Sequence, residues 1–362
     1  MTLLAVSVFG DSIEQVRSEI DSAVELGADL IELRVDLMEN LADDEIRSLR
    51  QHRPSHIPLI LTIRTKAEGG AWDGPDDQRI SRIIELAPAA DYIDIELATW
   101  QRSANIRQKI CQALARTGAI SPSATNQETA TATGPRLILS RHHLTSRPPK
   151  LQTDFLAMLD ESPAPSPAQD PIPKLVWPSR TVRDNFEALE LLRQSPRPPI
   201  IICTGDEGLA SRVLARKFGA FATFAAVAAG REAAAGQPSI ADLKNLYRWD
   251  TIDAETRVYG VLGDPVQHSL SPRLHNAAFA ATGENAVYLP WRILGSYESF
   301  KAFMVEVTAR PWLDFRGFSV TIPHKQNALR YLHETGGTID PLAQRIGALN
   351  TLTLAPDGHL TG

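Results

Sequence analysis

The 362-residue sequence has little of several features that mark large classes of protein. It contains only two cysteines, Cys111 and Cys203, and neither lies in a Cys-x-x-Cys or Cys/His cluster, which argues against a disulfide scaffold and a structural zinc site. No apolar run is long enough to span a bilayer, and the first residues lack the basic segment of a secretory signal. We therefore expect a soluble, cytoplasmic protein that needs no membrane.

Positive charge is not in excess either. A formal net charge of −6 argues against the basic surface of a nucleic-acid-binding protein, although a local arginine cluster could still receive a small anion. Hydrophobic residues make up 43% and charged residues 22% of the chain, as in globular proteins. Because single domains usually have roughly 100–200 residues, the length predicts two domains.

Short apolar runs recur through the first two-thirds of the chain, and the stretches between them space apolar residues at helical period. The runs are LLAVSVF, LIELRVD, PLILTIRT, YIDIEL, RLILSRH, PKLVW, PIIICTG and FATFAAV. Eight such units predict a (β/α)8 TIM barrel, because near-continuous apolar strands fit a parallel sheet that is buried on both faces. An open, doubly wound α/β sheet is the alternative fold.

Composition changes mark insertions and a domain boundary. Residues 121–134 are rich in Ser, Thr and Ala and residues 162–173 in Pro, and both stretches are typical of surface insertions. The pattern changes again around residues 242–257, and a new strand begins at Val258. We expect a barrel over residues 1–249 and a smaller α/β domain over residues 257–362, with no internal repeat relating them.

Polar residues recur toward the carboxyl ends of the predicted strands, where the catalytic groups of α/β barrels gather. They are Glu32, Arg34, Arg64, Glu68, Asp94, Glu96, His142, Lys174, Arg212 and Gln237. Each alone has an ordinary explanation, such as an internal salt bridge, a turn, or a lysine that reaches solvent from a strand start. Their shared placement in successive β-α units favours a common site.

This set of residues supports Schiff-base chemistry. A lysine surrounded by arginines and shielded from water is pushed toward its neutral amine, which can attack a ketone. A histidine nearby could then remove a proton α to the iminium, with Glu68 orienting it. Arg64 and Arg212 offer planar forks for a substrate carboxylate, and no metal or redox cofactor is needed.

The order of motifs makes a family resemblance specific. ELRVD, TIRTKAEGG, DIEL, SRHHL, KLVW, GLASR, FGAFATF and GQP follow one another, and residues 3–250 resemble type I 3-dehydroquinate dehydratases. The resemblance implies cofactor-free dehydration of 3-dehydroquinate to 3-dehydroshikimate. It implies Lys174 as Schiff-base former, His142 as general acid/base and Glu68 as its partner. The implied substrate contacts are Glu32, Arg34, Arg64, Arg212 and Gln237.

Two positions depart from the family pattern. His143 stands where an acidic residue usually follows the catalytic histidine, and Ala233 to Gln237 reads AAAGQ where Ser-Ala-Pro-Gly-Gln is usual. The lost serine removes a hydrogen bond of about 0.5–1.5 kcal/mol. We therefore expect weaker binding or looser closure of this loop, and an enzyme that stays active.

The end of the chain resembles another family. YGVLGDPVQHSLSPRLHNAAF, FRGFSVTIPHK and RIGALNTL resemble the substrate-binding domain of shikimate dehydrogenase. The resemblance implies that Ser269, Ser271, Thr321 and Asn350 hold shikimate and that Lys325 is catalytic. It also implies NADP, but no Gly-x-Gly-x-x-Gly follows a strand, and the sequence stops at Gly362. We expect the front portion of a bifunctional dehydratase–dehydrogenase whose cofactor domain is absent.

Two other functions stay open. The chain could be a non-catalytic protein that binds acids of the shikimate pathway, or a different Schiff-base barrel such as an aldolase. Under either interpretation the partners are small acids, with no nucleic acid and with a homodimer as a possible assembly.

Overall fold

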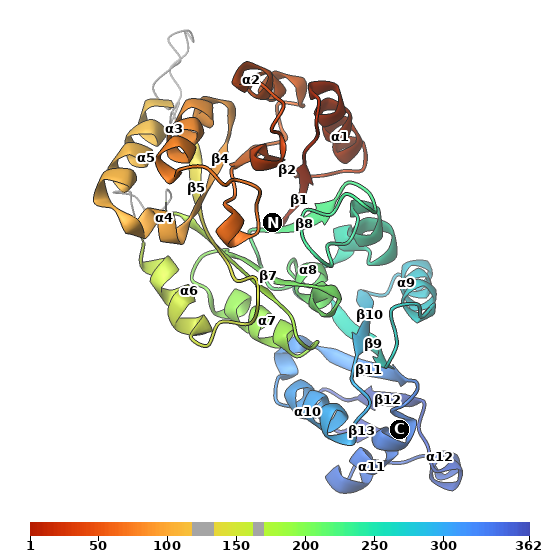
Figure 1. The fold of residues 1–362 in the computed structure, drawn as a ribbon. Coiled ribbons are helices and arrows are strands. Elements are labelled where there is room, and N and C mark those ends of the chain that lie inside the picture. Colours follow the sequence, from red (N-terminus) through yellow and green to blue (C-terminus); the bar gives the residue numbers. More distant parts are fainter. Residues whose placement is uncertain (118–133, 162–169) are drawn as a thin grey trace, which may run out of the picture.

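The computed structural model describes residues 1–117, 134–161 and 170–362 (Figure 1). The predicted insertion at residues 121–134 lies outside this part of the chain except for its last residue, and so do residues 162–169 of the second insertion. Ile172 and Pro173 belong to a strand, so the second insertion is shorter than predicted. No helix of the described residues is long and apolar enough to cross a bilayer.

The first sheet is a nearly closed parallel barrel. Its eight strands are β1 (Leu3–Val8), β2 (Leu30–Arg34), β3 (Leu59–Thr62), β4 (Tyr92–Glu96), β5 (Arg136–His142), β6 (Ile172–Pro178), β7 (Ile200–Thr204) and β8 (Ala222–Ala226). The hydrogen-bonded order β7-β6-β5-β4-β3-β2-β1-β8 is parallel throughout. Beside the seam between β7 and β8, the Phe221 N–H donates to the Pro199 carbonyl at 2.8 Å. The predicted TIM-type barrel is confirmed over the doubly wound alternative.

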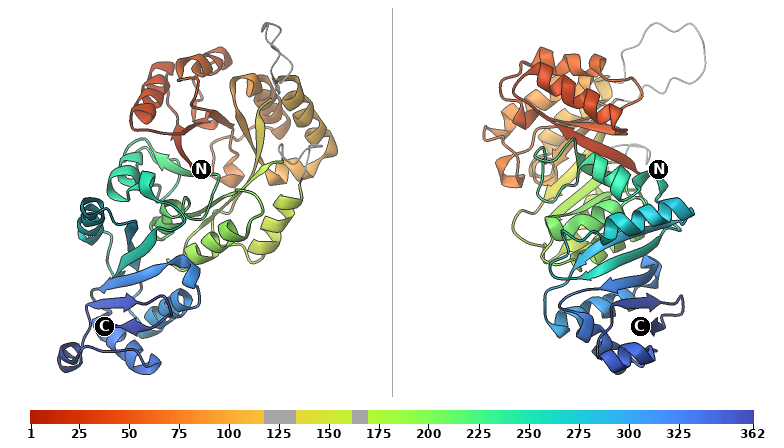
Figure 2. Two further views of the ribbon diagram at one scale, coloured as in Figure 1. Left: turned by 180° about the vertical axis from the view of Figure 1, so that it is seen from behind. Right: turned by 90° about the vertical axis from the view of Figure 1, so that its right-hand side faces the viewer.

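Helices surround the barrel on its outer side (Figures 1 and 2). They are α1 (Ile13–Glu25), α2 (Asp43–His52), α3 (Asp76–Leu86), α4 (Leu97–Arg102), α5 (Ala104–Thr117), α6 (Leu151–Asp160), α7 (Asp184–Gln194) and α8 (Leu209–Val213), with short turns η1 (Val35–Leu37), η2 (Lys66–Glu68), η3 (Ala87–Ala89) and η5 (Asp206–Gly208). Helix α1 illustrates how the sequence determines where such a helix starts and which face it buries. The Ser12 side chain accepts a hydrogen bond from the Gln15 N–H at its start, and Val16, Ile20 and Ala23 form its buried stripe.

Period-two alternation explains how each strand serves both the core and the site. In β2, Leu30, Glu32 and Arg34 face the barrel interior, whereas Ile31 and Leu33 pack into the layer beneath the helices. The interior is filled by a small apolar cluster of Ala5, Leu30, Ile60, Ile138, Ile172, Val176, Ile200, Ile202, Ala222 and Phe224. Inward polar residues follow toward the carboxyl ends of the strands, where a cavity opens above this cluster.

The second sheet follows the turns η6 (Asp242–Leu246) and η7 (Trp249–Thr251). Its strands are β9 (Arg257–Gly263), β10 (Ala286–Arg292), β11 (Phe315–Val320), β12 (Thr351–Leu354) and β13 (Leu360–Thr361), in the order β10-β9-β11-β12-β13. Strands β10, β9 and β11 are parallel, while β12 and β13 are antiparallel to their neighbours. Its helical elements are α9 (Ser271–Thr282), α10 (Tyr297–Thr308), η8 (Pro311–Leu313), α11 (Lys325–Thr335) and α12 (Pro341–Ile346).

The two sheets share a continuous hydrophobic core. Phe186 of α7 packs against Trp291, Phe303 and Phe315 of the second unit, with ring centroids 5.6–6.1 Å apart. Beside this aromatic cluster, buried Lys217 of the barrel forms an ion pair of 2.9 Å with Asp314. The second unit is therefore packed firmly against the barrel.

Candidate active site

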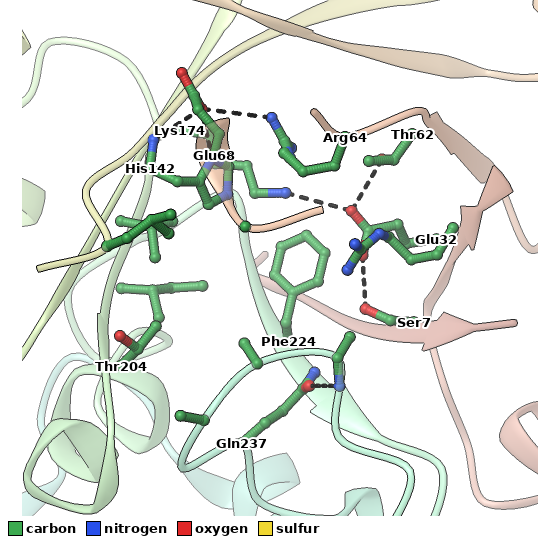
Figure 3. Close-up of a pocket in the computed structure, with 18 of the residues that line it drawn as sticks. Ser7, Glu32, Thr62, Arg64, Glu68, His142, Lys174, Thr204, Phe224 and Gln237 are labelled. Carbon is green, nitrogen blue, oxygen red and sulfur yellow. Dashed lines mark hydrogen bonds and ion pairs between the residues drawn. The ribbon is translucent and has the colours of Figure 1, made fainter. Parts of the chain in front are cut away.

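A cavity of about 380 Å³ opens at the carboxyl ends of the barrel strands (Figure 3). All eight barrel residues that the sequence assigns to the site line it: Glu32, Arg34, Arg64, Glu68, His142, Lys174, Arg212 and Gln237. Parallel strands bring their carboxyl ends to one rim, so residues far apart in the chain meet there. The structure thus brings the whole predicted barrel set together.

Lys174 lies at the centre of this cavity and is 4% exposed. It is the third residue of β6, so the expectation that it opens the strand is wrong. Its Nζ donates to Asp94 Oδ2 at 2.9 Å and to Glu32 Oε1 at 3.3 Å, and it lies 4.4 Å from the centroid of the Phe224 ring. Arginines line the same cavity as expected, but the nearest charged partners of Lys174 are carboxylates.

Both carboxylates are held by several donors. Glu32 accepts hydrogen bonds from Ser7 at 2.6 Å and Thr62 at 2.9 Å in addition to Lys174 (Figure 3). Burial alone would raise the pKa of Glu32, but Lys174 and Arg34 outweigh it and lower that pKa. The pKa of Asp94 is also lowered, because Arg64 and Lys174 outweigh its burial. Both side chains are therefore ionised at neutral pH.

His142 and Glu68 form a hydrogen-bonded pair in the cavity. Glu68 Oε2 lies 3.0 Å from His142 Nδ1 and accepts the His142 backbone N–H at 2.9 Å. Burial, reinforced by Arg64 and Lys174, holds the pKa of His142 well below its usual range, whereas burial raises the pKa of Glu68 to about 7. An ionised Glu68 would hold the Nδ1–H tautomer and leave Nε2 of a neutral imidazole as the base.

The three arginines differ in their partners. Arg34 places Nε and Nη2 on Asp36 at 3.0 and 2.8 Å, and Arg64 places Nη2 on Asp94 at 2.8 Å. Arg212 donates to the Phe224 carbonyl at 3.2 Å, and its buried Nε has no hydrogen-bond partner. Within the part of the chain that the structure describes, no carboxylate forms an ion pair with Arg212, although it is 1% exposed. Burial lowers its pKa to about 10, so it remains a cation at neutral pH.

The loop after β8 closes one side of the cavity. Gln237 Oε1 accepts the Ala233 N–H at 2.8 Å, and the Ala235 carbonyl accepts the Gly205 N–H at 2.9 Å. Gly236 has φ +67°, and a Cβ there would lie 2.3 Å from the Gly205 carbonyl, which explains the glycine of the GQ motif. His143 also lines the cavity, and its Nε2 lies 4.0 Å from Asp154.

The residues assigned to the second site lie at a different place, along one edge of the second sheet. Ser269 follows β9, Ser271 begins α9, Thr321 follows β11, Lys325 begins α11 and Asn350 precedes β12. These are the carboxyl ends of two parallel strands and the start of an antiparallel neighbour. The Asn350 carbonyl accepts the Val320 N–H at 2.7 Å, and Ser269 Oγ accepts the Ser271 N–H at 3.2 Å. Lys325 and Asn350 are exposed.

The structure adds side chains to which the sequence assigns no role, apart from Asp94, which the sequence already places among the polar strand ends. Asp94 contacts Lys174 directly, Phe224 lies under it, and Ser7 and Thr62 hold Glu32. Ser140 connects Arg64 to Asp94. Inward-facing polar positions in otherwise apolar strands are the signal that could have identified all of them except Phe224, which resembles an ordinary core residue.

A barrel with a buried lysine, a histidine–carboxylate pair and an unpaired arginine at its rim belongs to the α/β-barrel enzymes. Residues 4–254 match the family model of type I 3-dehydroquinase, and the chain belongs to that family. Residues 261–352 match the model of the shikimate dehydrogenase substrate binding domain.

Individual relatives agree with both matches. A bifunctional 3-dehydroquinate dehydratase/shikimate dehydrogenase of Arabidopsis thaliana, described as chloroplastic, is 32% identical over 366 residues, which cover 100% of this chain and 54% of the relative. The chain thus spans about half the length of that relative. A shikimate dehydrogenase (NADP(+)) of Moorella thermoacetica is 46% identical over 101 residues, covering 28% of this chain and 31% of the relative. The crystal structure of the 3-dehydroquinate dehydratase from Aquifex aeolicus is similar to this chain with 26% identity and a TM-score of 0.52. The match covers 67% of this chain and 98% of the Aquifex chain.

Proposed function

We propose that the barrel converts 3-dehydroquinate to 3-dehydroshikimate through a Schiff base on Lys174. The observation that carries this proposal is a buried lysine amine that shares a cavity with a neutral histidine and an unpaired arginine. Simple binding of an acid requires an arginine but neither of the other two groups. A cavity of about 380 Å³ also suits a small ring acid.

Each of the cavity residues has a defined step in the proposed reaction. Lys174 Nζ gives up a proton to His142 and attacks the ketone carbon. His142 returns that proton to the carbinolamine hydroxyl, which leaves as water, and an iminium remains. His142 Nε2 removes a proton from the carbon next to the iminium and protonates the departing hydroxyl, which leaves as water. Hydrolysis of the iminium then restores the carbonyl and the Lys174 amine. Glu32 and Asp94 stabilise the cationic states of the nitrogen.

Arg212 would hold the substrate carboxylate. Arg34 and Arg64 already bind Asp36 and Asp94, so their guanidinium forks are largely occupied. A buried guanidinium without an anionic partner is costly, and an incoming carboxylate would supply that partner through charge-assisted hydrogen bonds. Gln237 and the rest of the loop 232–237 would close over the ligand.

The test compares the wild-type chain with Lys174→Ala. Dehydration creates a conjugated enone, so wild-type protein with 3-dehydroquinate should gain ultraviolet absorbance, and the variant should lose activity by about a thousandfold or more. Borohydride added during turnover should reduce the iminium and leave a stable adduct on Lys174, detectable by peptide mass spectrometry.

Lys66→Ala is the matched control, because Lys66 is exposed and pairs with Asp73 outside the cavity. It should keep wild-type activity. Equal absorbance changes in wild type and Lys174→Ala, or an unmodified Lys174 after borohydride, would overturn the Schiff-base mechanism. Release of two smaller fragments would instead indicate an aldolase.

We further propose that residues 1–249 and 257–362 are separate functional units and that the second unit binds the dehydrated acid or its reduced form. Ser269, Ser271, Thr321 and Asn350 would bind ring substituents and the carboxylate, and Lys325 would assist the reacting oxygen. The described strands belong to two sheets, and no glycine-rich turn of the dinucleotide type follows any of them, so we derive no step through NADP. A cytoplasmic address and a homodimer stay predictions.

A further inference from the structure

Ser140 is a buried residue of β5 that does not line the cavity but contacts two groups of the site. It is 0% exposed, and its Oγ donates to Asp94 Oδ1 at 2.5 Å and accepts from Arg64 Nη1 at 2.6 Å. A guanidinium can only donate and a carboxylate only accept, so the bonds must run from Arg64 to Ser140 to Asp94. One hydroxyl therefore connects the two side chains.

The strand register places Ser140 directly beside the reacting lysine. Ser140 pairs with Lys174 on β6 and with Glu96 on β4, and laterally paired residues of neighbouring strands share a face. Because Ser140 holds Oδ1 of Asp94, Oδ2 of that carboxylate faces Lys174 Nζ at 2.9 Å. Arg64 Nη2 donates to the same Oδ2 at 2.8 Å, so Ser140 and Arg64 together set the orientation of the main carboxylate partner of Lys174.

Arg64 has alternative carboxylates within reach. Its Nη1 lies 3.7 Å from Glu68 Oε2 and 3.7 Å from Glu96 Oε1, whereas its contact with Ser140 is shorter. If the hydroxyl were removed, Nη1 would be buried without an acceptor, which is unfavourable. Nη1 would then move closer to Glu68 and Glu96, while Nη2 keeps its ion pair with Asp94.

We propose that Ser140 is a positioning residue of the dehydration reaction. Its hydroxyl holds Arg64 Nη1 beside Asp94 Oδ1, in addition to the direct ion pair of Arg64 with Asp94. This arrangement directs Asp94 toward Lys174 and leaves Glu68 to His142. This role rests on the proposed function of the barrel. It differs from a purely structural role because it changes the charge that Glu68 experiences.

The expected signature is therefore a shift in pH dependence together with a loss of rate. Arg64 already lowers the pKa of Glu68 against the effect of burial, and a closer approach would lower it further. In Ser140→Ala we expect kcat to fall about 10- to 100-fold, with a smaller change in KM. The acidic limb of the profile of kcat against pH should move to lower pH.

A second variant at position 140 and a control variant at Thr223 test whether Ser140 positions the site. Ser140→Cys keeps the shape of the side chain with a somewhat larger atom that hydrogen-bonds only weakly. It should therefore behave like Ser140→Ala, and it serves if the alanine variant does not fold by circular dichroism. Thr223→Val is the control, since Thr223 is buried on β8 with an unpartnered hydroxyl and lies outside the cavity lining. Thr223→Val should keep the wild-type kcat and the wild-type position of the acidic limb in the profile of kcat against pH.

A folded Ser140→Ala or Ser140→Cys enzyme with the wild-type acidic limb and with kcat within about twofold of wild type would overturn the role of Ser140 alone. An inactive wild-type enzyme would overturn the proposed function, and the role of Ser140 with it. Measuring the wild-type profile first separates the two failures.

Discussion

Glu68 is the residue of the cavity whose pKa lies close to neutral pH. It is buried beside His142, and burial raises its pKa to about 7 in spite of the nearby Arg64. The pKa of His142 lies far lower, again mainly because of burial. A titration near neutral pH therefore belongs to the carboxyl group and not to the imidazole.

This difference predicts the pH dependence of the enzyme. As the pH falls through about 7, Glu68 takes up a proton and no longer holds the Nδ1–H of His142 as a carboxylate. We expect kcat to decrease on the acidic side of that value, as measured by the ultraviolet assay between about pH 5 and pH 9.

Glu68→Gln provides the comparison at the same position. An amide can still accept from Nδ1–H but cannot titrate, so this variant should be roughly tenfold slower and should lack the acidic limb. An unchanged limb in Glu68→Gln would assign the titration to another group.

At the scale of elements, the loop 231–237 is tied to the barrel at both ends. Arg231 donates to Glu19 and to the Phe9 carbonyl, each at 2.6 Å, and lies over the Phe9 ring. Ala235 accepts from Gly205 at the other end. The AAAGQ sequence lacks the usual serine, and these contacts hold the loop over the cavity by other means.

We therefore predict that Arg231→Met loosens the loop. Because closure contributes to binding more than to chemistry, KM for 3-dehydroquinate should rise about three- to tenfold while kcat changes less. Steady-state kinetics checks this outcome. Arg47→Met, at an exposed pair with Asp44 on α2, is the matched control and should leave both constants unchanged. A fall in kcat with an unchanged KM would contradict the assignment.

At the scale of the whole molecule, the aromatic cluster around Phe186 joins the two units. Phe186, Trp291, Phe303 and Phe315 are all buried, and they belong to the core that continues from the barrel into the second unit. A buried core that runs across both units couples them more tightly than the polar contacts typical of mobile domains. Unfolding of one unit should therefore expose apolar surface on the other.

This coupling predicts a single unfolding transition. In guanidinium chloride, loss of dehydratase activity and loss of circular dichroism should coincide for the wild type. Phe186→Ala should destabilise the protein by about 3–5 kcal/mol and separate the two curves. Ile46→Ala, in the barrel core on α2, should lower both midpoints together. Separate curves in the wild type would contradict the coupling.

The sequence by itself determined the strand order and the polar rim. Each of the eight predicted barrel strands is present within one or a few residues of its expected bounds, and all eight barrel site residues line one cavity. These features are local. The two-residue period of a strand and the alternation of strands with helices decide which side chains point inward and at which end.

Only the tertiary structure decided which of these groups contact one another. Lys174 pairs with Glu32 and Asp94, which lie 142 and 80 residues away. Of the arginines expected around it, Arg34 binds Asp36, Arg64 shares Asp94 with Lys174, and Arg212 has no carboxylate partner among the described residues. Ser140 is an inward-facing polar position of β5, but its contacts with Arg64 and Asp94 are likewise not predicted from the sequence. The contacts of Lys174 connect β6 to β2 and β4, which are not its neighbours in the sheet, and they depend on distances of a few ångströms that are not encoded in the pattern of any single strand.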